Sequence, residues 1–362
     1  MSKSAFLTKR RRKIAAIGVL MTAALALTGC GSDDAETISI VGFAVPEQAN
    51  KAIQKEFNKT DAGKDVKFKT SYGASGEQSR NVEAGQKADY VHLSVATDVD
   101  RLVKAGLIDA SWNKGENKGI VSTSVVVFGV RDGNPKNIQT WADLVKPGVE
   151  IVTPNPASSG AARWNALAAW GSVTENGGTE AEATDYLNKL FKNVVQLSNS
   201  GRDATTAFTG GTGDVLLAYE NEAILAAQNG QGFDYIIPDT TMLIENPGAV
   251  LKDAVPSAKS WLDFVLSNEG QKQFALKGFR PLNLAAPGTA DLAALGLTPA
   301  DIKGAPNAAD PYPAVKQLLT LDKNFGGGDW SGVKDKLFGD GKEGKPVGIV
   351  TKAIADSGKA SS

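Results

Sequence analysis

Strand-like and helix-like segments alternate along most of the chain, and this alternation is the feature that most restricts its fold. Short apolar runs recur between longer segments with helical spacing. The predicted strands are 37–44, 66–71, 89–94, 124–130, 150–153, 194–197, 214–219, 233–237 and 242–245. The predicted helices include 46–58, 76–84, 98–106, 141–145, 160–170, 181–192, 220–228 and 260–276. Strands regularly separated by helices favour βαβ units and parallel sheets, so we predict an α/β fold.

The N-terminus has the features of an export signal. Basic residues at 9–13 precede an apolar stretch at 14–27, which is shorter than the roughly 20 residues of a membrane-spanning helix. The stretch ends in Leu27-Thr28-Gly29-Cys30, which resembles the bacterial lipobox whose cysteine is lipidated. The alternative is a signal followed by an incidental cysteine. We predict a signal peptide at 1–29, a tether at 30–36 and a lipid anchor on Cys30 outside the cytoplasmic membrane.

Charge and cysteine content narrow the functional classes. The chain has 39 basic and 40 acidic residues, so its formal charge is −1. Six basic and no acidic residues lie in 1–29, so removal of that segment leaves 33 basic and 40 acidic residues, or −7. Neither value indicates nucleic-acid binding. Because Cys30 is the only cysteine, no disulfide is expected within the chain.

The search for catalytic motifs is mostly negative. His92 is the only histidine and lies in an apolar strand, which favours a structural imidazole over a catalytic base. A zinc site would have to rely on carboxylates. The glycines near Lys345 have the spacing of a phosphate loop, but Pro346 occupies the position of its Ser or Thr. A Gly-x-Ser-x-Gly elbow is absent. Hydrolysis by paired carboxylates stays open, but no local arrangement favours it. We therefore predict a non-enzyme with no metal and no cofactor.

Three small-residue turns at the ends of predicted strands stand out, and each precedes a predicted helix. They span residues 71–78, 154–165 and 198–203. Ser75 and Gln78 have the spacing of a capping box, and Ser159 is a good N-cap. The first N–H groups of a helix lack partners within the helix and carry the positive end of its dipole, so each turn is a candidate anion site. Each turn taken alone is more often only a helix cap.

Several colinear motifs resemble the sulfate- and thiosulfate-binding proteins of bacterial ABC importers. The resemblance runs in order from about residue 38 to about residue 327. The motifs that carry it are Gly73-Ala74-Ser75-Gly76-Glu77-Gln78-Ser79-Arg80, Ala96-Thr97-Asp98-Val99-Asp100, Arg131-Asp132-Gly133-Asn134-Pro135-Lys136, residues 154–156 and 159–171, and Gly213-Asp214-Val215-Leu216-Leu217-Ala218-Tyr219-Glu220-Asn221-Glu222.

The resemblance implies a two-lobed, type II periplasmic-binding-protein fold with a central ligand cleft. Two crossover strands, near 123–127 and 238–243, would join the lobes. Lobe 1 would then be discontinuous, with residues 37–124 and 240–362, and lobe 2 would be 125–239. The segment 281–313, rich in Pro, Ala and Gly, is predicted to be a wrapping loop.

The resemblance also implies which groups bind the dianion, namely backbone N–H groups, a serine hydroxyl and an indole N–H, without a counter-charge. Carried onto this sequence, the ligand-binding residues are Ala44, Ser75, Ser159, Gly160, Ala161, Gly201 and Tyr219. Ser159 would act through its hydroxyl. Ala44, Ser75, Gly160, Ala161 and Gly201 would act through their backbone N–H groups. Tyr219 occupies the indole position, and the phenol there is the main departure from the family. Arg202 could neutralise part of the charge of the bound dianion. Alternatively, it could pair with Asp203 or Glu220 at the surface.

The implied function is capture of sulfate or thiosulfate between two lobes and delivery to an ABC permease and its ATPase subunits. The predicted protein is an extracytoplasmic, lipid-anchored monomer with no nucleic-acid partner. A site of donors alone suits sulfate, which is fully ionised at neutral pH, better than hydrogen phosphate, whose proton needs an acceptor. Molybdate or tungstate binding, a sulfatase or phosphatase, and a structural envelope lipoprotein stay open as alternatives.

Overall fold

The computed structural model describes residues 35–282, 291–326, 329–342 and 344–359. The chain divides into residues 1–34 and residues 35–362, so the predicted signal peptide, Cys30 and the start of the tether lie outside the described residues. The predicted end of the tether differs from the structure. The Glu36 carboxylate accepts a hydrogen bond from the Ser257 N–H at 3.0 Å, so Glu36 already belongs to the folded unit.

Ten strands form one sheet in the described part of the chain. They are β1 (Thr37–Phe43), β2 (Lys67–Gly73), β3 (Tyr90–His92), β4 (Ile120–Val130), β5 (Ile151–Pro154), β6 (Val194–Ser198), β7 (Val215–Tyr219), β8 (Asp234–Ile236), β9 (Thr240–Val250) and β10 (Gln317–Leu319). The nine predicted strands correspond to β1–β9. Strand β10, which pairs with β9, is not among the predicted strands.

The sheet has two parallel halves joined by antiparallel strands. Its order is β2-β1-β3-β9-β4-β7-β5-β6, with β10 on β9 and β8 on β4. We call β2, β1 and β3 the first half, and β7, β5 and β6 the second half. Pairing is parallel within each half, as predicted. The β3–β9, β9–β4 and β4–β7 pairs are antiparallel, which the alternation of strands and helices does not predict.

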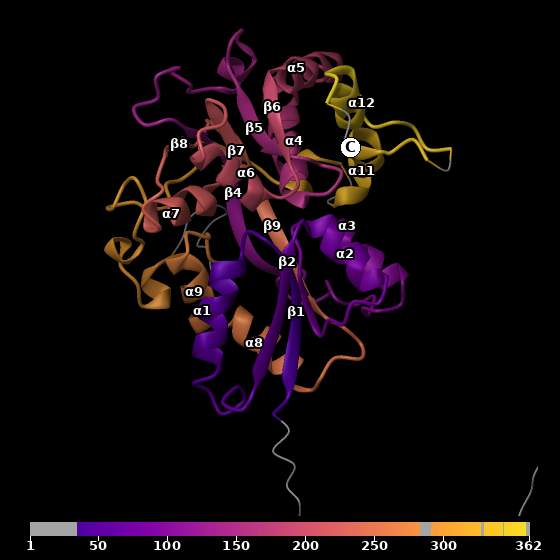
Figure 1. The fold of residues 1–362 in the computed structure, drawn as a ribbon, viewed down its shortest axis with the longest axis vertical. Coiled ribbons are helices and arrows are strands. Elements are labelled where there is room, and N and C mark those ends of the chain that lie inside the picture. Colours follow the sequence, from indigo (N-terminus) through magenta and orange to yellow (C-terminus); the bar gives the residue numbers. More distant parts are fainter. Residues whose placement is uncertain (1–34, 283–290, 327–328, 343, 360–362) are drawn as a thin grey trace, which may run out of the picture. The chain divides into compact units, whose positions relative to one another are not determined.

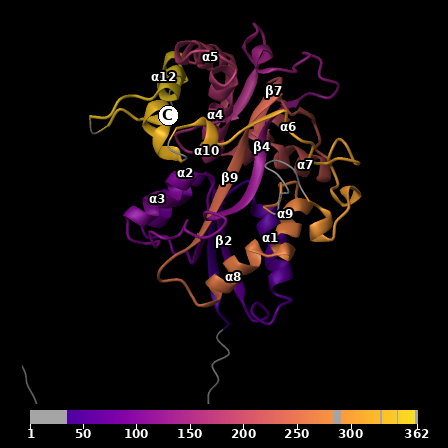
Figure 2. The ribbon, with the colours of Figure 1, turned by 180° about the vertical axis from the view of Figure 1, so that it is seen from behind.

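The long strands β4 and β9 lie side by side in the middle of the sheet (Figures 1 and 2). Residues 120–125 of β4 pair with β9, and residues 126–130 pair with β7. Residues 243–247 of β9 pair with β4, and residues 248–250 pair with β3. A run of β-branched residues in β4, buried over nearly its whole length, suits such a central strand. Both strands therefore connect the two halves.

Helices follow most strands of each half. They are α1 (Glu47–Phe57), α2 (Ser75–Glu83), α3 (Ala96–Lys104), α4 (Gly160–Thr174), α5 (Glu180–Asn193), α6 (Gly201–Thr209), α7 (Glu220–Gln228), α8 (Ser257–Leu266), α9 (Asn268–Leu276), α10 (Leu321–Asn324), α11 (Lys334–Phe338) and α12 (Ile349–Asp356). Helix α4 is buried along most of its length because alanine, leucine and tryptophan occur on all its sides. It contacts β5 and β7 of the second half and the central strands β4 and β9.

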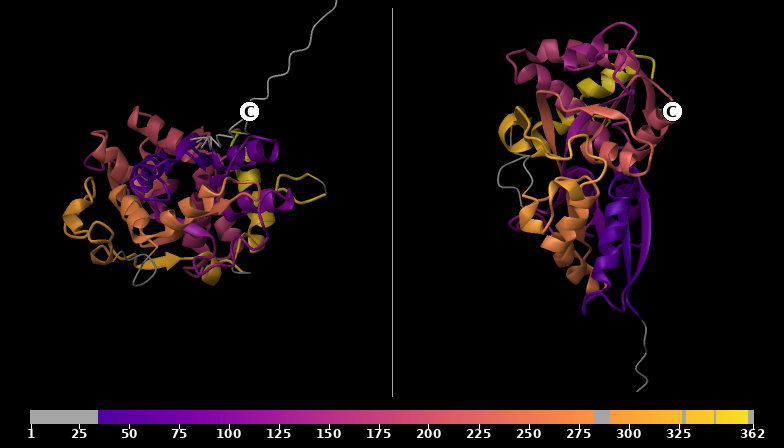
Figure 3. Two further views of the ribbon diagram at one scale, coloured as in Figure 1. Left: turned by 90° about the horizontal axis from the view of Figure 1, so that it is seen from below. Right: turned by 90° about the vertical axis from the view of Figure 1, so that its left-hand side faces the viewer.

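The C-terminal helices differ in position from the predicted lobe 1 range of 240–362. Helix α12 lies against α5, within the predicted lobe 2 (Figures 1 and 3). The Lys359 ammonium donates to the Phe191 carbonyl at 3.0 Å, and the buried Val350 and Ile354 belong to the same apolar cluster as Leu187. Burial of this apolar face places the end of the chain on the second half. The other lobe boundaries stay a prediction.

The predicted wrapping loop at 281–313 is described at 281–282 and 291–313. It contains two short 3-10 helices, η2 (Ala293–Leu295) and η3 (Pro299–Asp301). Leu295 and Tyr312 pack in a cluster with Ile224 of α7, and the Tyr312 hydroxyl donates to the Ala275 carbonyl at 2.6 Å. The segment therefore covers α7 and α9. No helix among the described residues is both long and apolar enough to cross a membrane.

Candidate functional site

The predicted ligand-binding residues all lie at or just after the carboxyl ends of strands. Ala44 and Ser75 follow β1 and β2 in the first half. Ser159 and Gly201 follow β5 and β6 in the second half, and Tyr219 ends β7. In open α/β sheets, ligands bind at this edge. Three helices, α2, α4 and α6, begin there and present N-terminal N–H groups.

The α4 turn has donors without protein partners. Ser159 is the N-cap residue of α4, as predicted, but its hydroxyl makes no capping hydrogen bond. The N–H groups of Gly160 and Ala161 likewise make no hydrogen bond with any residue that the structure describes. The Ser159 N–H donates to the Asn155 carbonyl at 2.8 Å, which holds the turn in place. One hydroxyl and two N–H groups therefore remain for a ligand.

Ser75 differs from the predicted capping box. It is the first residue of α2, and Ala74 is the N-cap residue. The Ser75 hydroxyl donates to Asp98 Oδ2 at 2.6 Å and accepts from the Ser94 N–H at 2.9 Å, so it is not available to cap the helix. The Ser75 N–H has no partner in the described part of the chain. Its backbone donor is thus free, as the resemblance requires.

Gly201 connects the α6 turn with the other turns. Ser200 is the N-cap of α6, and its hydroxyl accepts from the Asp203 N–H at 3.1 Å. The Gly201 N–H makes no hydrogen bond to a described residue. A methyl group built on Gly201 would lie 3.1 Å from Val45 Cγ2 and 3.3 Å from Ala161 Cβ. The end of β1 and the α4 and α6 turns therefore meet at one place.

Ala44 does not have the free donor expected of it. Its N–H donates to the Gly73 carbonyl at 2.9 Å and so extends the pairing of β1 with β2 by one residue. The next N–H, that of Val45, makes no hydrogen bond with the described residues. The Val45 donor replaces that of Ala44 in the candidate site.

Tyr219 is buried, and its hydroxyl already has protein partners. It lies 2.8 Å from Ser94 Oγ and accepts from Asn246 Nδ2 at 3.3 Å. Burial raises the pKa of the phenol above its usual value, so Tyr219 stays neutral at physiological pH. Ser94 and Asn246 are site residues that sequence reasoning missed. Ser94 follows β3 as Ser75 follows β2, and this shared position at a strand end is the signal that could have identified it.

Two arginines beside the turns, Arg202 and Arg163, each lie close to a carboxylate. Arg202 donates to both carboxylate oxygens of Glu222, at 2.7 and 2.8 Å, and to the Val45 carbonyl at 3.1 Å. Asp203 and Glu220 are the expected partners of Arg202. The fold instead places the buried Glu222 beside Arg202, and the two form an ion pair. Arg163 lies 3.9 Å from Asp98 Oδ1. Each guanidinium thus faces a carboxylate, and the two pairs add no net charge.

Hydrogen bonds join the two halves next to the site. The Gly76 N–H donates to the Ser158 carbonyl at 3.0 Å, and Trp164 Nε1 donates to the Ser94 carbonyl at 2.8 Å. Asn199 Nδ2 donates to Glu77 Oε2 at 3.0 Å. These contacts link α2 and the segment after β3 with α4 and with the turns that precede α4 and α6.

His92 is a fully buried imidazole. Its Nε2 lies 3.1 Å from Ser122 Oγ and its Nδ1 lies 3.3 Å from Asn50 Oδ1. Burial lowers its pKa to about 3, far below the usual 6.5. This placement agrees with the structural role that the sequence favours.

The buried imidazole predicts a pH dependence of stability. Between about pH 6 and pH 4 the unfolded chain binds a proton at His92 that the native protein does not, so acidification destabilises the fold. We expect the free energy of unfolding of the wild type to fall about 1.4 kcal/mol more per pH unit than that of His92→Gln. Urea titrations of both proteins measure this difference. Equal slopes for the two proteins would contradict it.

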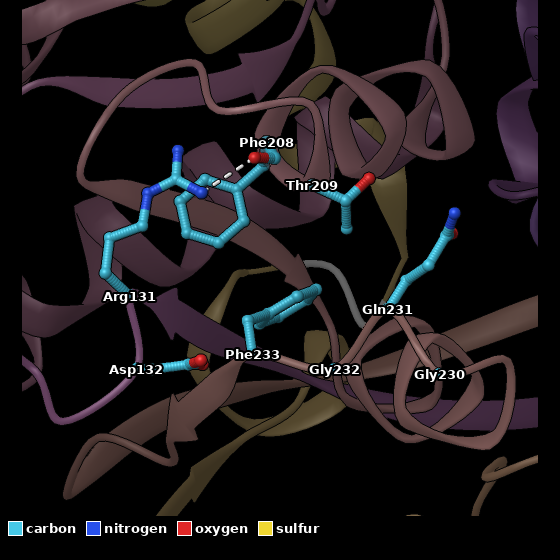
Figure 4. Close-up of a pocket in the computed structure, with 8 residues that line it drawn as sticks. All are labelled: Arg131, Asp132, Phe208, Thr209, Gly230, Gln231, Gly232 and Phe233. Carbon is cyan, nitrogen blue, oxygen red and sulfur yellow. Dashed lines mark hydrogen bonds between the residues drawn. The ribbon is translucent and has the colours of Figure 1, made fainter.

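A surface pocket lies apart from these turns (Figure 4). Its lining residues are Arg131, Asp132, Phe208, Thr209, Gly230, Gln231, Gly232 and Phe233. Arg131 donates to the Phe208, Thr212 and Gly213 carbonyls at 2.6–2.9 Å, and its guanidinium lies 3.9 Å from the centre of the Phe208 ring. The Arg131 guanidinium therefore satisfies carbonyl groups at and just after the C-terminus of α6. Among the described residues, no group of three or more His, Cys, Asp or Glu side chains has the arrangement of a metal site.

Comparison with known proteins decides the family. Residues 38–280 match the family model described as bacterial extracellular solute-binding protein. The chain belongs to this family. The solute-binding protein is 40% identical to the sulfate-binding protein of Synechococcus elongatus, covering 86% of each chain. It is 36% identical to the thiosulfate-binding protein of Pseudomonas aeruginosa, covering 89% of this chain and 95% of that protein.

A solved structure supports the same relationship. The sulfate-binding protein SubI from Mycobacterium tuberculosis is 39% identical to this solute-binding protein, with a TM-score of 0.74. The match covers 84% of this chain and 99% of SubI. The predicted α/β solute-binding fold is thereby confirmed.

Proposed function

We propose that this protein is the substrate-binding component of a sulfate or thiosulfate ABC importer. The observation that carries the proposal is the meeting of three helix N-termini whose N–H groups lack protein partners. The donors are the N–H groups of Val45, Ser75, Gly160, Ala161 and Gly201, together with the Ser159 hydroxyl. Relatives that bind sulfate or thiosulfate, at 36–40% identity over most of the chain, support it.

The donor set also favours a fully ionised oxyanion. N–H groups only donate, and the nearby carboxylates of Asp98 and Glu222 are already engaged by Ser75 and Arg202. Hydrogen phosphate would bring a proton without an acceptor, at a cost of about 1–3 kcal/mol. Helix dipoles, which act over the first turn, would stabilise the two negative charges in place of a counter-ion.

Calorimetric titration of the lipid-free protein at pH 8 tests this function. We expect sulfate or thiosulfate to bind about 10- to 100-fold more tightly than phosphate, as the unsatisfied proton implies. Equal affinities for phosphate and sulfate would contradict the donor-only site. Competition between molybdate and sulfate tests the main alternative, a molybdate-binding protein. If no oxyanion binds, the result would favour a structural lipoprotein.

Binding would be coupled to contact between the two halves of the sheet. Val45 and Ser75 lie on the first half, whereas Ser159, Gly160, Ala161 and Gly201 lie on the second. Neither half holds the complete donor set, so the ligand would favour the conformation in which the halves meet. The loaded monomer would then be delivered to a permease driven by its ATPase subunits. It would carry out no catalysis itself.

The same proposal places the protein outside the cytoplasm, in agreement with its family of extracellular solute-binding proteins. Lipid on Cys30, after removal of residues 1–29, would anchor it to the cell membrane. Mass spectrometry of the membrane fraction tests the anchor. An acylated N-terminal peptide starting at Cys30 supports it, and an unmodified one contradicts it.

A further inference from the structure

Ser94 lies among the turns of the candidate site, and its backbone is held on both sides. Its N–H donates to Ser75 Oγ at 2.9 Å. Its carbonyl accepts from Trp164 Nε1 at 2.8 Å and from Asn246 Nδ2 at 3.0 Å. The residue is fully buried. These bonds connect β3, α2, α4 and β9, so the position of the Ser94 side chain is fixed by both halves of the sheet.

The Ser94 hydroxyl faces the α4 turn. A methyl group built on Gly160 would lie 2.7 Å from both Cβ and Oγ of Ser94. Gly160 carries one of the N–H groups that lack a protein partner. The Ser94 hydroxyl is therefore close to Gly160, whose N–H belongs to the proposed anion site. The absence of a side chain on Gly160 makes this approach possible.

The hydrogens of this cluster can be counted. Ser122 Oγ donates to Asn246 Oδ1 at 3.4 Å, which turns Nδ2 of that amide toward Ser94 and Tyr219. The two Nδ2 hydrogens bond the Ser94 carbonyl and the Tyr219 oxygen. The Ser94 and Tyr219 hydroxyls, 2.8 Å apart, carry two hydrogens between them, and their mutual bond uses one. The other hydrogen has no acceptor among the described residues.

A buried O–H that lacks an acceptor and lies beside the free N–H groups of the proposed site points to a ligand that accepts. A phenol is a stronger acid than an aliphatic alcohol, so Tyr219 is the better donor within the pair and Ser94 the better acceptor. This direction leaves the Ser94 hydrogen free. We propose that Ser94 donates its O–H to the bound dianion and that Tyr219 and Asn246 are positioning residues. The assignment rests on the proposed function.

Calorimetric titration of sulfate into single and double variants tests the assignment. We expect Ser94→Ala to weaken binding about 10- to 100-fold, which corresponds to about 1.4–2.8 kcal/mol. Tyr219→Phe removes only a neutral partner, so we expect a loss of roughly 2- to 5-fold. The double variant should bind like Ser94→Ala, because Tyr219 acts through Ser94.

Ser124→Ala is the matched control. Ser124 is another fully buried serine, located on β4, and its hydroxyl has no hydrogen-bond partner. Its replacement should leave the affinity unchanged. Thermal unfolding without ligand, run on every variant, separates a loss of ligand contact from a loss of folding.

Each other outcome overturns the assignment. Unchanged affinity in a folded Ser94→Ala removes Ser94 from the contacts. A Tyr219→Phe loss equal to or larger than that of Ser94→Ala makes the phenol the donor, and an equal loss in Ser124→Ala makes the effect nonspecific. If the wild type binds none of the oxyanions, the proposed function fails and the assignment fails with it. Wild-type binding distinguishes that case from failure of Ser94 alone.

Discussion

We expect Ser159→Asp to weaken sulfate binding about 1000-fold while the protein stays folded. The new carboxylate would occupy the N-cap of α4, where aspartate is a preferred residue, and would accept the helix N–H groups itself. It would also repel the dianion. Two like charges about 4 Å apart cost about 4 kcal/mol near a protein surface, which corresponds to roughly three orders of magnitude in affinity. Calorimetry measures the affinity, and thermal unfolding without ligand measures the fold.

Ser159→Asn is the matched control for this prediction. The amide has nearly the same shape as the carboxylate but no charge, so it retains the competition for N–H groups and removes the repulsion. We expect a loss of about 10- to 100-fold for this variant. If both variants bind equally well, charge at Ser159 does not act on the ligand. Unchanged affinity in both would place Ser159 outside the site.

Replacing Arg280 with methionine should produce the largest loss of stability. Arg280 and Glu220 are both fully buried, and the guanidinium donates to the two carboxylate oxygens at 2.6 and 2.9 Å. Methionine would leave the Glu220 charge buried and unpaired. Removal of one partner from a buried pair costs about 3–5 kcal/mol, so we expect the free energy of unfolding in urea to fall by about this amount.

Two further variants separate charge from packing at this pair. Arg280→Met combined with Glu220→Gln removes both charges and should restore much of the lost stability. Lys259→Met removes one partner of an exposed pair at a similar distance, 2.8 Å, and should cost less than about 1 kcal/mol. An Arg280→Met variant as stable as the wild type would contradict this account. So would a double variant that is no more stable than Arg280→Met alone.

The Arg280 pair also bears on the geometry of the proposed site. Glu220 directly follows Tyr219, and the Arg280 N–H donates to the Thr123 carbonyl on β4 at 3.0 Å. The Thr123 hydroxyl donates back to the Arg280 carbonyl at 2.8 Å. The start of α7 is thereby fixed to a strand that connects both halves of the sheet.

Local sequence signals located the α4 and α6 turns well. Serine, glycine and alanine after a short strand predict a helix start, and α4 and α6 begin at Gly160 and Gly201. The same signal located the start of α2, but the capping box predicted at Ser75 is absent, because the Ser75 hydroxyl bonds Asp98 and Ser94 from other segments. The resemblance implied a free donor at Ala44, but the pairing of β1 with β2 extends by one residue and engages the Ala44 N–H.

The sequence by itself determined the α/β class, the parallel pairing within each half and the resemblance to anion-binding proteins, because these depend on periodicity and on contiguous motifs. Only the tertiary structure decided which donors lack partners and which residues stand around them. Ser94, Asn246 and Tyr219 are far apart in the chain, and they meet only because β9 lies between β3 and β4. A hydrogen-bond donor is free or engaged according to neighbours that local sequence does not specify.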